Sequence, residues 1–113
     1  MHELGLMQSA LDMALAHARR AGASRIHRVR LRVGAQSGVV VDALELAFTV
    51  ATPGTPADGA ELVVEPVPVV CRCERCERDF EPEDVIYCCP ICGDVSAQVR
   101  QGLELELASL EVS

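Results

Sequence analysis

Two pairs of cysteines, each with two residues between its members, constrain the fold of this chain more than any other feature. The pairs are Cys73 with Cys76 and Cys89 with Cys92. Four thiolates at this spacing can surround one ion as a tetrahedron at about 2.3 Å, the geometry of structural zinc. Residues 71–96 are too few and too polar to form an apolar core. We therefore expect a bound metal ion to hold this segment together.

Two further cysteines, Cys71 and Cys88, lie beside these pairs. Either could replace a ligand in an alternative shell, but four sulfurs already complete the shell, and we expect both to be non-ligands. A closed shell leaves no coordination position for a reactive water, which argues against a zinc enzyme. An iron–sulfur cluster also uses four thiolates and stays open as an alternative.

Composition sets the size of the core and the character of the surface. The chain has 113 residues, half of them hydrophobic, but only two Phe, one Tyr and no Trp, so we expect one mainly aliphatic core. The formal net charge is −7. Such a surface repels phosphate backbones and suits cations or basic proteins, so no nucleic-acid partner is expected.

The sequence shows neither a secretory signal nor an apolar run of the ~18 residues that a membrane span requires. We therefore expect a cytoplasmic protein with no membrane partner. In a reducing cytoplasm, six cysteines between positions 71 and 92 are interpreted as metal ligands before disulfides.

Hydrophobic periodicity predicts two helices and three strands outside the cysteine segment. The first helix is expected over residues 4–21, and the second begins near Asp42, because Asp42 and Glu45 have the spacing of a capping box. The strands are expected where apolar and charged residues alternate, over residues 26–33, 60–65 and 103–112.

The first and last strands carry opposite charges on their polar faces. Arginines alternate with apolar residues in the first strand, and Glu104 and Glu106 alternate with leucines in the last. Opposite charges favour cross-strand pairing, so we expect these two strands to be neighbours. The alternation of the last strand shifts at Ala108–Ser109, which fits a bulge. Pro66 is expected to end the pairing of the second strand.

The order of elements predicts an α+β fold: a small three-stranded sheet with two helices on one face. A zinc-ribbon-like subdomain with four cysteines is inserted before the last strand. We expect residues 1–68 and 99–113 to form the α/β domain and residues 69–98 the zinc-binding domain.

The chain begins Met1-His2-Glu3, which brings together an amine, an imidazole and a carboxylate. With ionised backbone amides, these groups can form the tetragonal nitrogen shell that suits Ni²⁺ or Cu²⁺. A solvated terminus without metal is the alternative that the residues alone leave open. His17 is expected to be solvated in the first helix, and His27 to lie at the end of the first strand.

Taken together, these features resemble the HypA/HybF family of hydrogenase maturation, and the resemblance covers essentially the whole chain. The residues that carry it are the terminal Met1-His2-Glu3, the loop Val33-Gly34-Ala35-Gln36-Ser37-Gly38, and the two cysteine pairs in their order and spacing.

The resemblance implies a nickel metallochaperone that helps to insert Ni²⁺ into the large subunit of [NiFe] hydrogenase. By position, it assigns transported nickel to Met1, His2 and Glu3, and structural zinc to Cys73, Cys76, Cys89 and Cys92. It also implies work with the nickel-binding GTPase HypB, and some members of the family serve urease. No nucleotide-binding loop is present in the sequence, so any GTP hydrolysis belongs to the partner, and we expect no enzymatic activity from this chain.

The main rival is a zinc-ribbon interaction module that transfers no metal, as in a transcription or RNA-processing assembly. Such a module is expected to present basic and aromatic surfaces to nucleic acid. A net charge of −7 and 3% aromatic residues weigh against that function.

Overall fold

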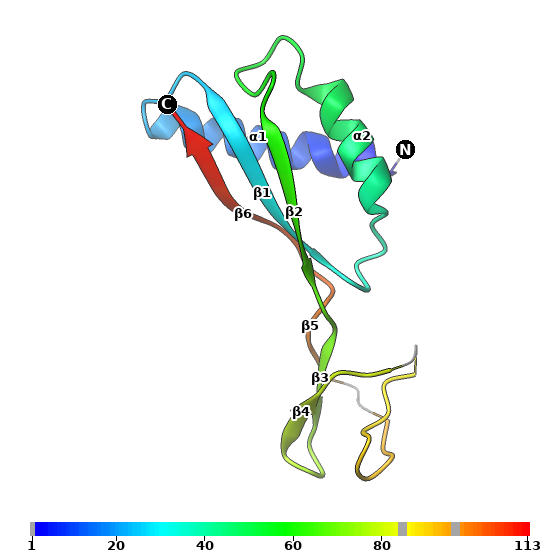
Figure 1. The fold of residues 1–113 in the computed structure, drawn as a ribbon. Coiled ribbons are helices and arrows are strands. Elements are labelled where there is room, and N and C mark those ends of the chain that lie inside the picture. Colours follow the sequence, from blue (N-terminus) through cyan, green and yellow to red (C-terminus); the bar gives the residue numbers. More distant parts are fainter. Residues whose placement is uncertain (1, 84–85, 96–97) are drawn as a thin grey trace. The chain divides into compact units, whose positions relative to one another are not determined.

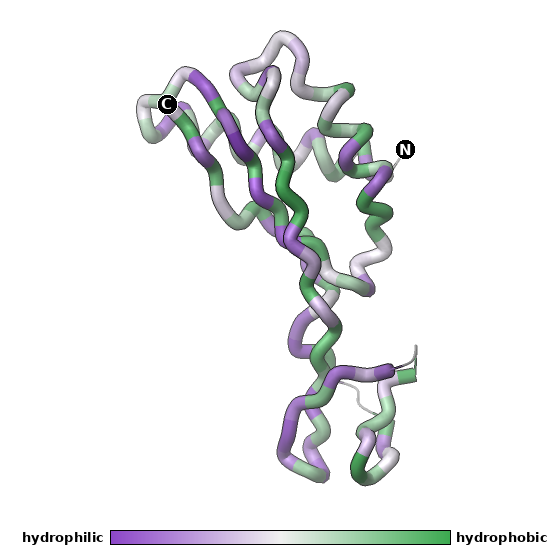
Figure 2. The backbone as a smooth tube through the Cα atoms, viewed as in Figure 1, coloured by the Kyte–Doolittle hydropathy of each residue, from purple (hydrophilic) through white to green (hydrophobic). Residues whose placement is uncertain are grey.

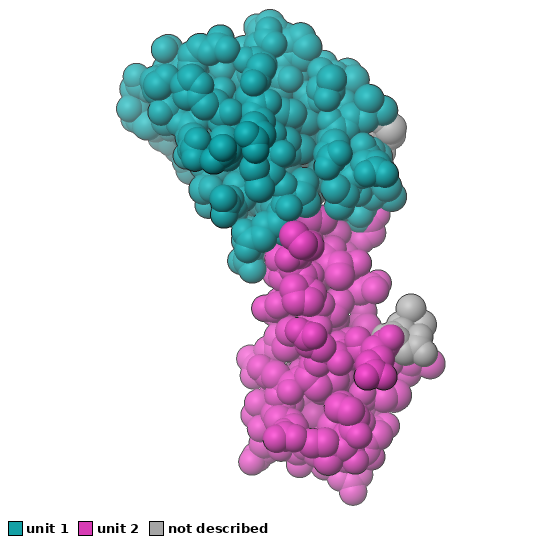
Figure 3. All heavy atoms as spheres, viewed as in Figure 1, with its two compact units in different colours: residues 1–32, 39–65, 105–113 teal, residues 33–38, 66–104 magenta. Residues whose placement is uncertain are grey.

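The computed structural model describes residues 2–83, 86–95 and 98–113, and these fall into two compact units (Figure 3). The helical unit comprises Met1–Arg32, Val39–Glu65 and Leu105–Ser113. The cysteine unit comprises Val33–Gly38 and Pro66–Glu104. Among the described residues, neither helix combines the length and apolar character needed to cross a membrane.

The helical unit contains the predicted two helices and three-stranded sheet. Its helices are α1 (His2–Arg20) and α2 (Val41–Ala51), and its strands are β1 (Ile26–Gly34), β2 (Glu61–Val67) and β6 (Leu105–Val112). The sheet has the order β2-β1-β6, and both helices lie on one side of it (Figure 1). This arrangement confirms the predicted fold class.

Apolar side chains on one stripe of each helix meet the inner face of the sheet. Figure 2 shows hydrophilic and hydrophobic residues alternating along β1, as a half-buried strand requires. The buried side chains of this core are mostly aliphatic, as the composition predicts, and include Met7, Leu11 and Ala14 of α1, Leu44, Ala47 and Phe48 of α2, and Val29 and Leu31 of β1.

Ion pairs on the outer face of the sheet show the strand directions. Two arginines of β1 each contact one glutamate of β2 and one of β6: Arg28 contacts Glu61 and Glu111, and Arg32 contacts Glu65 and Glu106. From the first arginine to the second, the residue number of the glutamate partner rises on β2 and falls on β6. Strand β2 is therefore parallel to β1 and β6 antiparallel, and the predicted pairing of the first and last strands is confirmed.

The same ion pairs locate an irregularity in β6. The two arginines are four residues apart on β1, whereas their partners Glu106 and Glu111 are five residues apart on β6. One extra residue on one strand is the count of a β-bulge. Ala108 and Ser109 are both exposed between these glutamates, so the alternation of burial along β6 shifts where the alternation of the sequence shifts.

Two sequence expectations about element boundaries are wrong. The N-cap of α2 is Val40, with no side-chain capping bond, and Asp42 lies inside the first turn instead of capping it. Local spacing suggested a capping box that starts at Asp42, but the N-cap lies two residues earlier, at Val40. Strand β2 also continues through Pro66 to Val67. An edge strand tolerates proline because the missing N–H can face away from its neighbour.

The cysteine unit contains a second three-stranded sheet, in the order β4-β3-β5. Its strands are β3 (Val70–Cys73), β4 (Arg78–Phe80) and β5 (Gln98–Gln101). Strand β3 pairs antiparallel with both neighbours. The two units differ in extent from the predicted domain boundaries, because Val33–Gly38 belong with the cysteine unit. The division into an α/β domain (residues 1–68 and 99–113) and a zinc-binding domain (residues 69–98) stays a prediction.

The loop Val33–Gly38 is held against the rest of the cysteine unit by backbone hydrogen bonds. The N–H groups of Ala35 and Gln36 donate to the carbonyls of Val67 and Gly102, both at 2.8 Å. A Cβ atom on Gly34 would overlap the backbone carbonyl group of Gly102. Glycine is therefore required at position 34 by the close approach of two backbones.

We predict that Gly34→Ala lowers the free energy of unfolding by about 1–3 kcal/mol, because the added methyl group meets backbone atoms that cannot rotate away. Urea unfolding of the zinc-loaded protein, followed by circular dichroism, measures the change. Gly5→Ala is the control: Gly5 lies in α1 with nothing within 4 Å of its added Cβ. It should raise stability by about 0.5–1 kcal/mol. Equal effects of the two variants would contradict the close approach.

Candidate metal centre

The two cysteine pairs meet in space. One sulfur from each of Cys73, Cys76, Cys89 and Cys92 lies within 4.8 Å of the other three. The Sγ atoms of Cys73 and Cys92 are 3.6 Å apart, and those of Cys89 and Cys76 are 3.9 Å apart. A regular tetrahedron with bonds of about 2.3 Å has sulfurs about 3.8 Å apart, so this spacing fits a zinc ion at the centre.

Two turns bring the sulfurs to this position. Cys73 ends β3, and Cys76 lies in the hairpin turn toward β4, where Glu77 has a positive φ of 51°. In the second turn, the N–H of Cys89 donates to the carbonyl of Asp94 at 2.8 Å, and the N–H of Gly93 donates to Cys89 at 2.9 Å. Gly93 has a φ of 76°, a conformation that favours glycine.

The backbone of the second turn favours the thiolate form of Cys89. Hydrogen bonds from the backbone of Cys92, and then of Ile91, lower the pKa of Cys89 to about 6. The pKa of Cys76 is instead raised to about 12, first by its hydrogen bond with the Cys92 side chain and then by burial. Without metal, the cluster thus favours one negative charge and resists others. A dication would offset that repulsion, and its binding releases protons.

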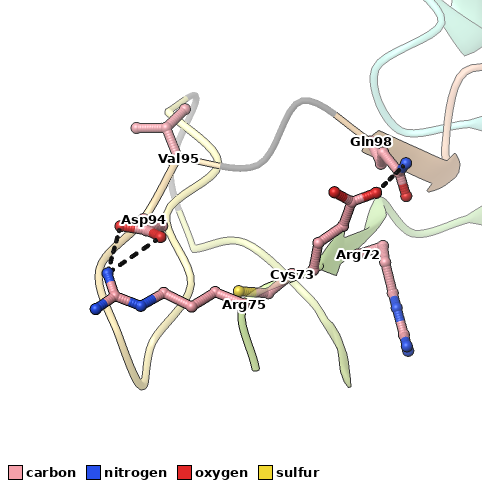
Figure 4. Close-up of a pocket in the computed structure, with 7 residues that line it drawn as sticks. Arg72, Cys73, Arg75, Asp94, Val95 and Gln98 are labelled. Carbon is pink, nitrogen blue, oxygen red and sulfur yellow. Dashed lines mark hydrogen bonds and ion pairs between the residues drawn. The ribbon is translucent and has the colours of Figure 1, made fainter. Parts of the chain in front are cut away.

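Side chains around the cluster connect the two turns. Arg75, between the first pair of cysteines, forms an ion pair of 3.4 Å with Asp94 after the second pair. Gln98 of β5 donates from Nε2 to Glu74 at 2.7 Å. These residues line a cavity of about 270 Å³ that also reaches Cys73 (Figure 4). The ion pair is largely exposed, so it adds little stability.

The other two cysteines are not part of the four-sulfur group. Cys71 is fully buried in the small core of the cysteine unit with Val69 and Phe80, and burial raises the pKa of its thiol. Cys88 is exposed and forms an isolated bridge with Val95. All six cysteines are free of disulfides.

The predicted terminal site is only partly within the described residues. Met1 lies outside them, as does the side chain of His2, whose backbone begins α1. The carboxylate of Glu3 accepts the backbone N–H of Val40 at 3.4 Å, a contact that the sequence did not predict. The remaining histidines, His17 and His27, are exposed, and their rings contact Arg20 and Ser113.

A family model described as hydrogenase/urease nickel incorporation, metallochaperone, hypA matches residues 1–112. The hydrogenase maturation factor HypA of a Picosynechococcus species is 45% identical over 112 residues, covering 99% of this chain and 99% of that protein.

Two solved structures have a similar fold. A solution structure of HypA protein has a TM-score of 0.76 and 27% identity, and covers 100% of this chain and 97% of its own. The solution structure of the Ni metallochaperone HypA from Helicobacter pylori has a TM-score of 0.71 and 24% identity, covering 97% and 96%. With its fold, its four-cysteine cluster and these matches along nearly its whole length, the chain belongs to the HypA family of nickel-incorporation proteins.

Proposed function

We propose that this protein is a cytoplasmic nickel metallochaperone that binds Ni²⁺ at Met1, His2 and Glu3 and helps to insert it into the large subunit of [NiFe] hydrogenase. The full-length match to the nickel-incorporation family carries this proposal. The GTPase HypB is the proposed partner in nickel transfer.

The start of α1 supports a nickel site made largely of nitrogen. The first N–H groups of a helix have no intrahelical acceptor, so the amides of His2 and Glu3 are available at the start of α1. Nickel can replace their protons without breaking a hydrogen bond of the helix. Together with the α-amine and the imidazole of His2, they supply the four nitrogens of a tetragonal shell.

The second proposed site is a structural zinc ion bound by Cys73, Cys76, Cys89 and Cys92. The spacing of the sulfurs supports it, and so does the make-up of the small core around them. Cysteines dominate that core, which otherwise contains Val69, Phe80, Tyr87 and Val99. So small an apolar cluster needs a metal ion to hold its shape.

The two sites suit different tasks. Four protein sulfurs leave no open position on zinc, so the zinc ion is retained. The terminal site consists of the first three residues of the chain, so an acceptor can approach it and replace its ligands one at a time. A chaperone must both bind its ion and release it, and only the terminal site allows release.

We predict that His2→Ala removes most nickel binding and leaves zinc content unchanged, because His2 supplies the only imidazole of the terminal site. Calorimetric titration of the untagged protein with Ni²⁺ measures the affinity, and metal analysis measures zinc. His17→Ala is the matched control, since His17 is exposed near the other end of α1. Nickel affinities that are equal in wild type and His2→Ala would refute the assignment.

For the zinc site, we predict that Cys73→Ala lowers zinc content from about one ion per chain to well below one, because it opens the tetrahedral shell. Cys71→Ala should leave zinc content unchanged, although the cavity it creates destabilises the cysteine unit. Metal analysis of the purified variants distinguishes the two. Zinc loss with Cys71→Ala and retention with Cys73→Ala would show that the ligand set is wrong.

Cellular function gives a further prediction. A deletion strain should make the hydrogenase large subunit without nickel, and excess Ni²⁺ in the medium should partly restore activity. Mass action can replace delivery of an ion, whereas it cannot replace a catalyst or a structural subunit. Normal hydrogenase and urease activity at limiting nickel would contradict the proposal. A defect that added nickel does not change would favour the zinc-ribbon interaction module.

A further inference from the structure

The side chain of Glu3, which belongs to α1, accepts a hydrogen bond from the N-terminus of the other helix, α2. Its Oε2 accepts the N–H of Val40 at 3.4 Å, and Val40 is the N-cap of α2. In a capping box, the residue three positions after the N-cap is a glutamate or glutamine that makes this bond. In α2 that position is Ala43, which has no acceptor. Glu3, on the neighbouring helix α1, thus makes the hydrogen bond that a glutamate at position 43 of α2 would make.

The side chain of the N-cap residue, Val40, does not cap the helix. Val40 has an extended backbone, with φ −89° and ψ 115°, as an N-cap requires, but its side chain forms no capping hydrogen bond. A carboxylate near the first turn also favours the positive end of the helix dipole. Among the described residues, Glu3 is the side chain that meets the backbone donor of this N-cap.

The contact lies at the common end of two packed helices. Met7 is one turn beyond Glu3 in α1, and Leu44 is one turn beyond Val40 in α2; both are completely buried. Residues four apart share one face of a helix, so the contact lies at the exposed N-terminal edge of the buried seam between these helices. The contact, although exposed, therefore links the first turn of α1 to the first turn of α2.

We infer that Glu3 is a positioning residue of the terminal nickel site, which it couples to the start of α2. Its carboxylate holds the first turn of α1 on Val40, while its backbone nitrogen stays available to the metal. This inference rests on the proposed nickel site at Met1, His2 and Glu3. Because coupling between two events is reciprocal, nickel binding tightens the first turn of α2, and loss of the cap weakens nickel binding by the same factor.

The cap is tested first without nickel, on the untagged, zinc-loaded full chain. Glu3→Ala should speed amide hydrogen exchange at Val40 by about fivefold, because the N–H loses its acceptor. Glu3→Gln keeps an acceptor oxygen, so its exchange rate at Val40 should lie between those of the wild type and Glu3→Ala. Unchanged exchange at Val40 in Glu3→Ala would overturn the inference whatever happens with nickel.

Nickel supplies the second arm of the test. Adding Ni²⁺ to the wild type should slow exchange at Val40, and Glu3→Ala should bind nickel about fivefold more weakly. The visible absorption spectrum of bound nickel should not change, because the carboxylate is not a ligand. The inference would be overturned by a changed spectrum in Glu3→Ala. It would also be overturned if Ni²⁺ left the exchange rate at Val40 unchanged in the wild type.

A rescue variant separates positioning from simple stabilisation of α2. Glu3→Ala combined with Ala43→Glu restores a carboxylate in the capping-box position of α2 itself. Exchange at Val40 should return to the wild-type rate, whereas nickel affinity should stay about fivefold weak, because the link between helices is still absent. Recovery of both would overturn the inference by showing a purely structural role.

A failure of the nickel site itself gives a different pattern. His2→Ala should lose nickel while keeping wild-type exchange at Val40, since the cap does not use that residue. Nickel affinity equal to wild type in His2→Ala would refute the terminal site, and the coupling with it, whereas the metal-free result on the cap would stand.

Discussion

Four cysteine sulfurs within 4.8 Å of one another are the constraint on which the cysteine unit depends. Neutral thiols at this distance form only weak contacts, and several thiolates would repel one another. The pKa of Cys89 is lowered, chiefly by backbone hydrogen bonds, whereas that of Cys76 is raised, first by its hydrogen bond with Cys92. A central dication offsets the repulsion, because each thiolate then gains an opposite charge. The four clustered cysteines also belong to, or pack against, the small core that contains Phe80.

The helical unit has a different source of stability from the cysteine unit. Its stability comes from an ordinary apolar core beneath a sheet whose outer face is covered by arginine–glutamate pairs. Among the described residues, the cluster of potential metal ligands lies in the cysteine unit and not in this one. A retained ion in one unit and a released ion at the terminus of the other fit the proposed task of delivery.

Features of the structure that depend on residues close together in the sequence, or on a regular pattern of charge, were predicted correctly. Cysteine spacing identified the four clustered sulfurs, and alternating charge identified β1 and β6 as neighbours. Features that depend on distant residues were not predictable. Strand β5 is four residues long and mostly polar, and it exists because β3 pairs with it. The need for glycine at position 34 comes from the backbone of Gly102. The N-cap of α2 was assigned to Asp42 instead of Val40, whose N–H meets Glu3, far away in the sequence.

The central claim is that two metal sites of different chemistry exist in one chain, with sulfur reserved for the retained ion. X-ray absorption at the zinc and nickel edges, on the untagged protein carrying both metals, tests it most directly. The account predicts zinc with four sulfurs at about 2.3 Å and nickel with four nitrogen neighbours and no sulfur. Sulfur in the nickel shell, or fewer than four sulfurs around zinc, would contradict it.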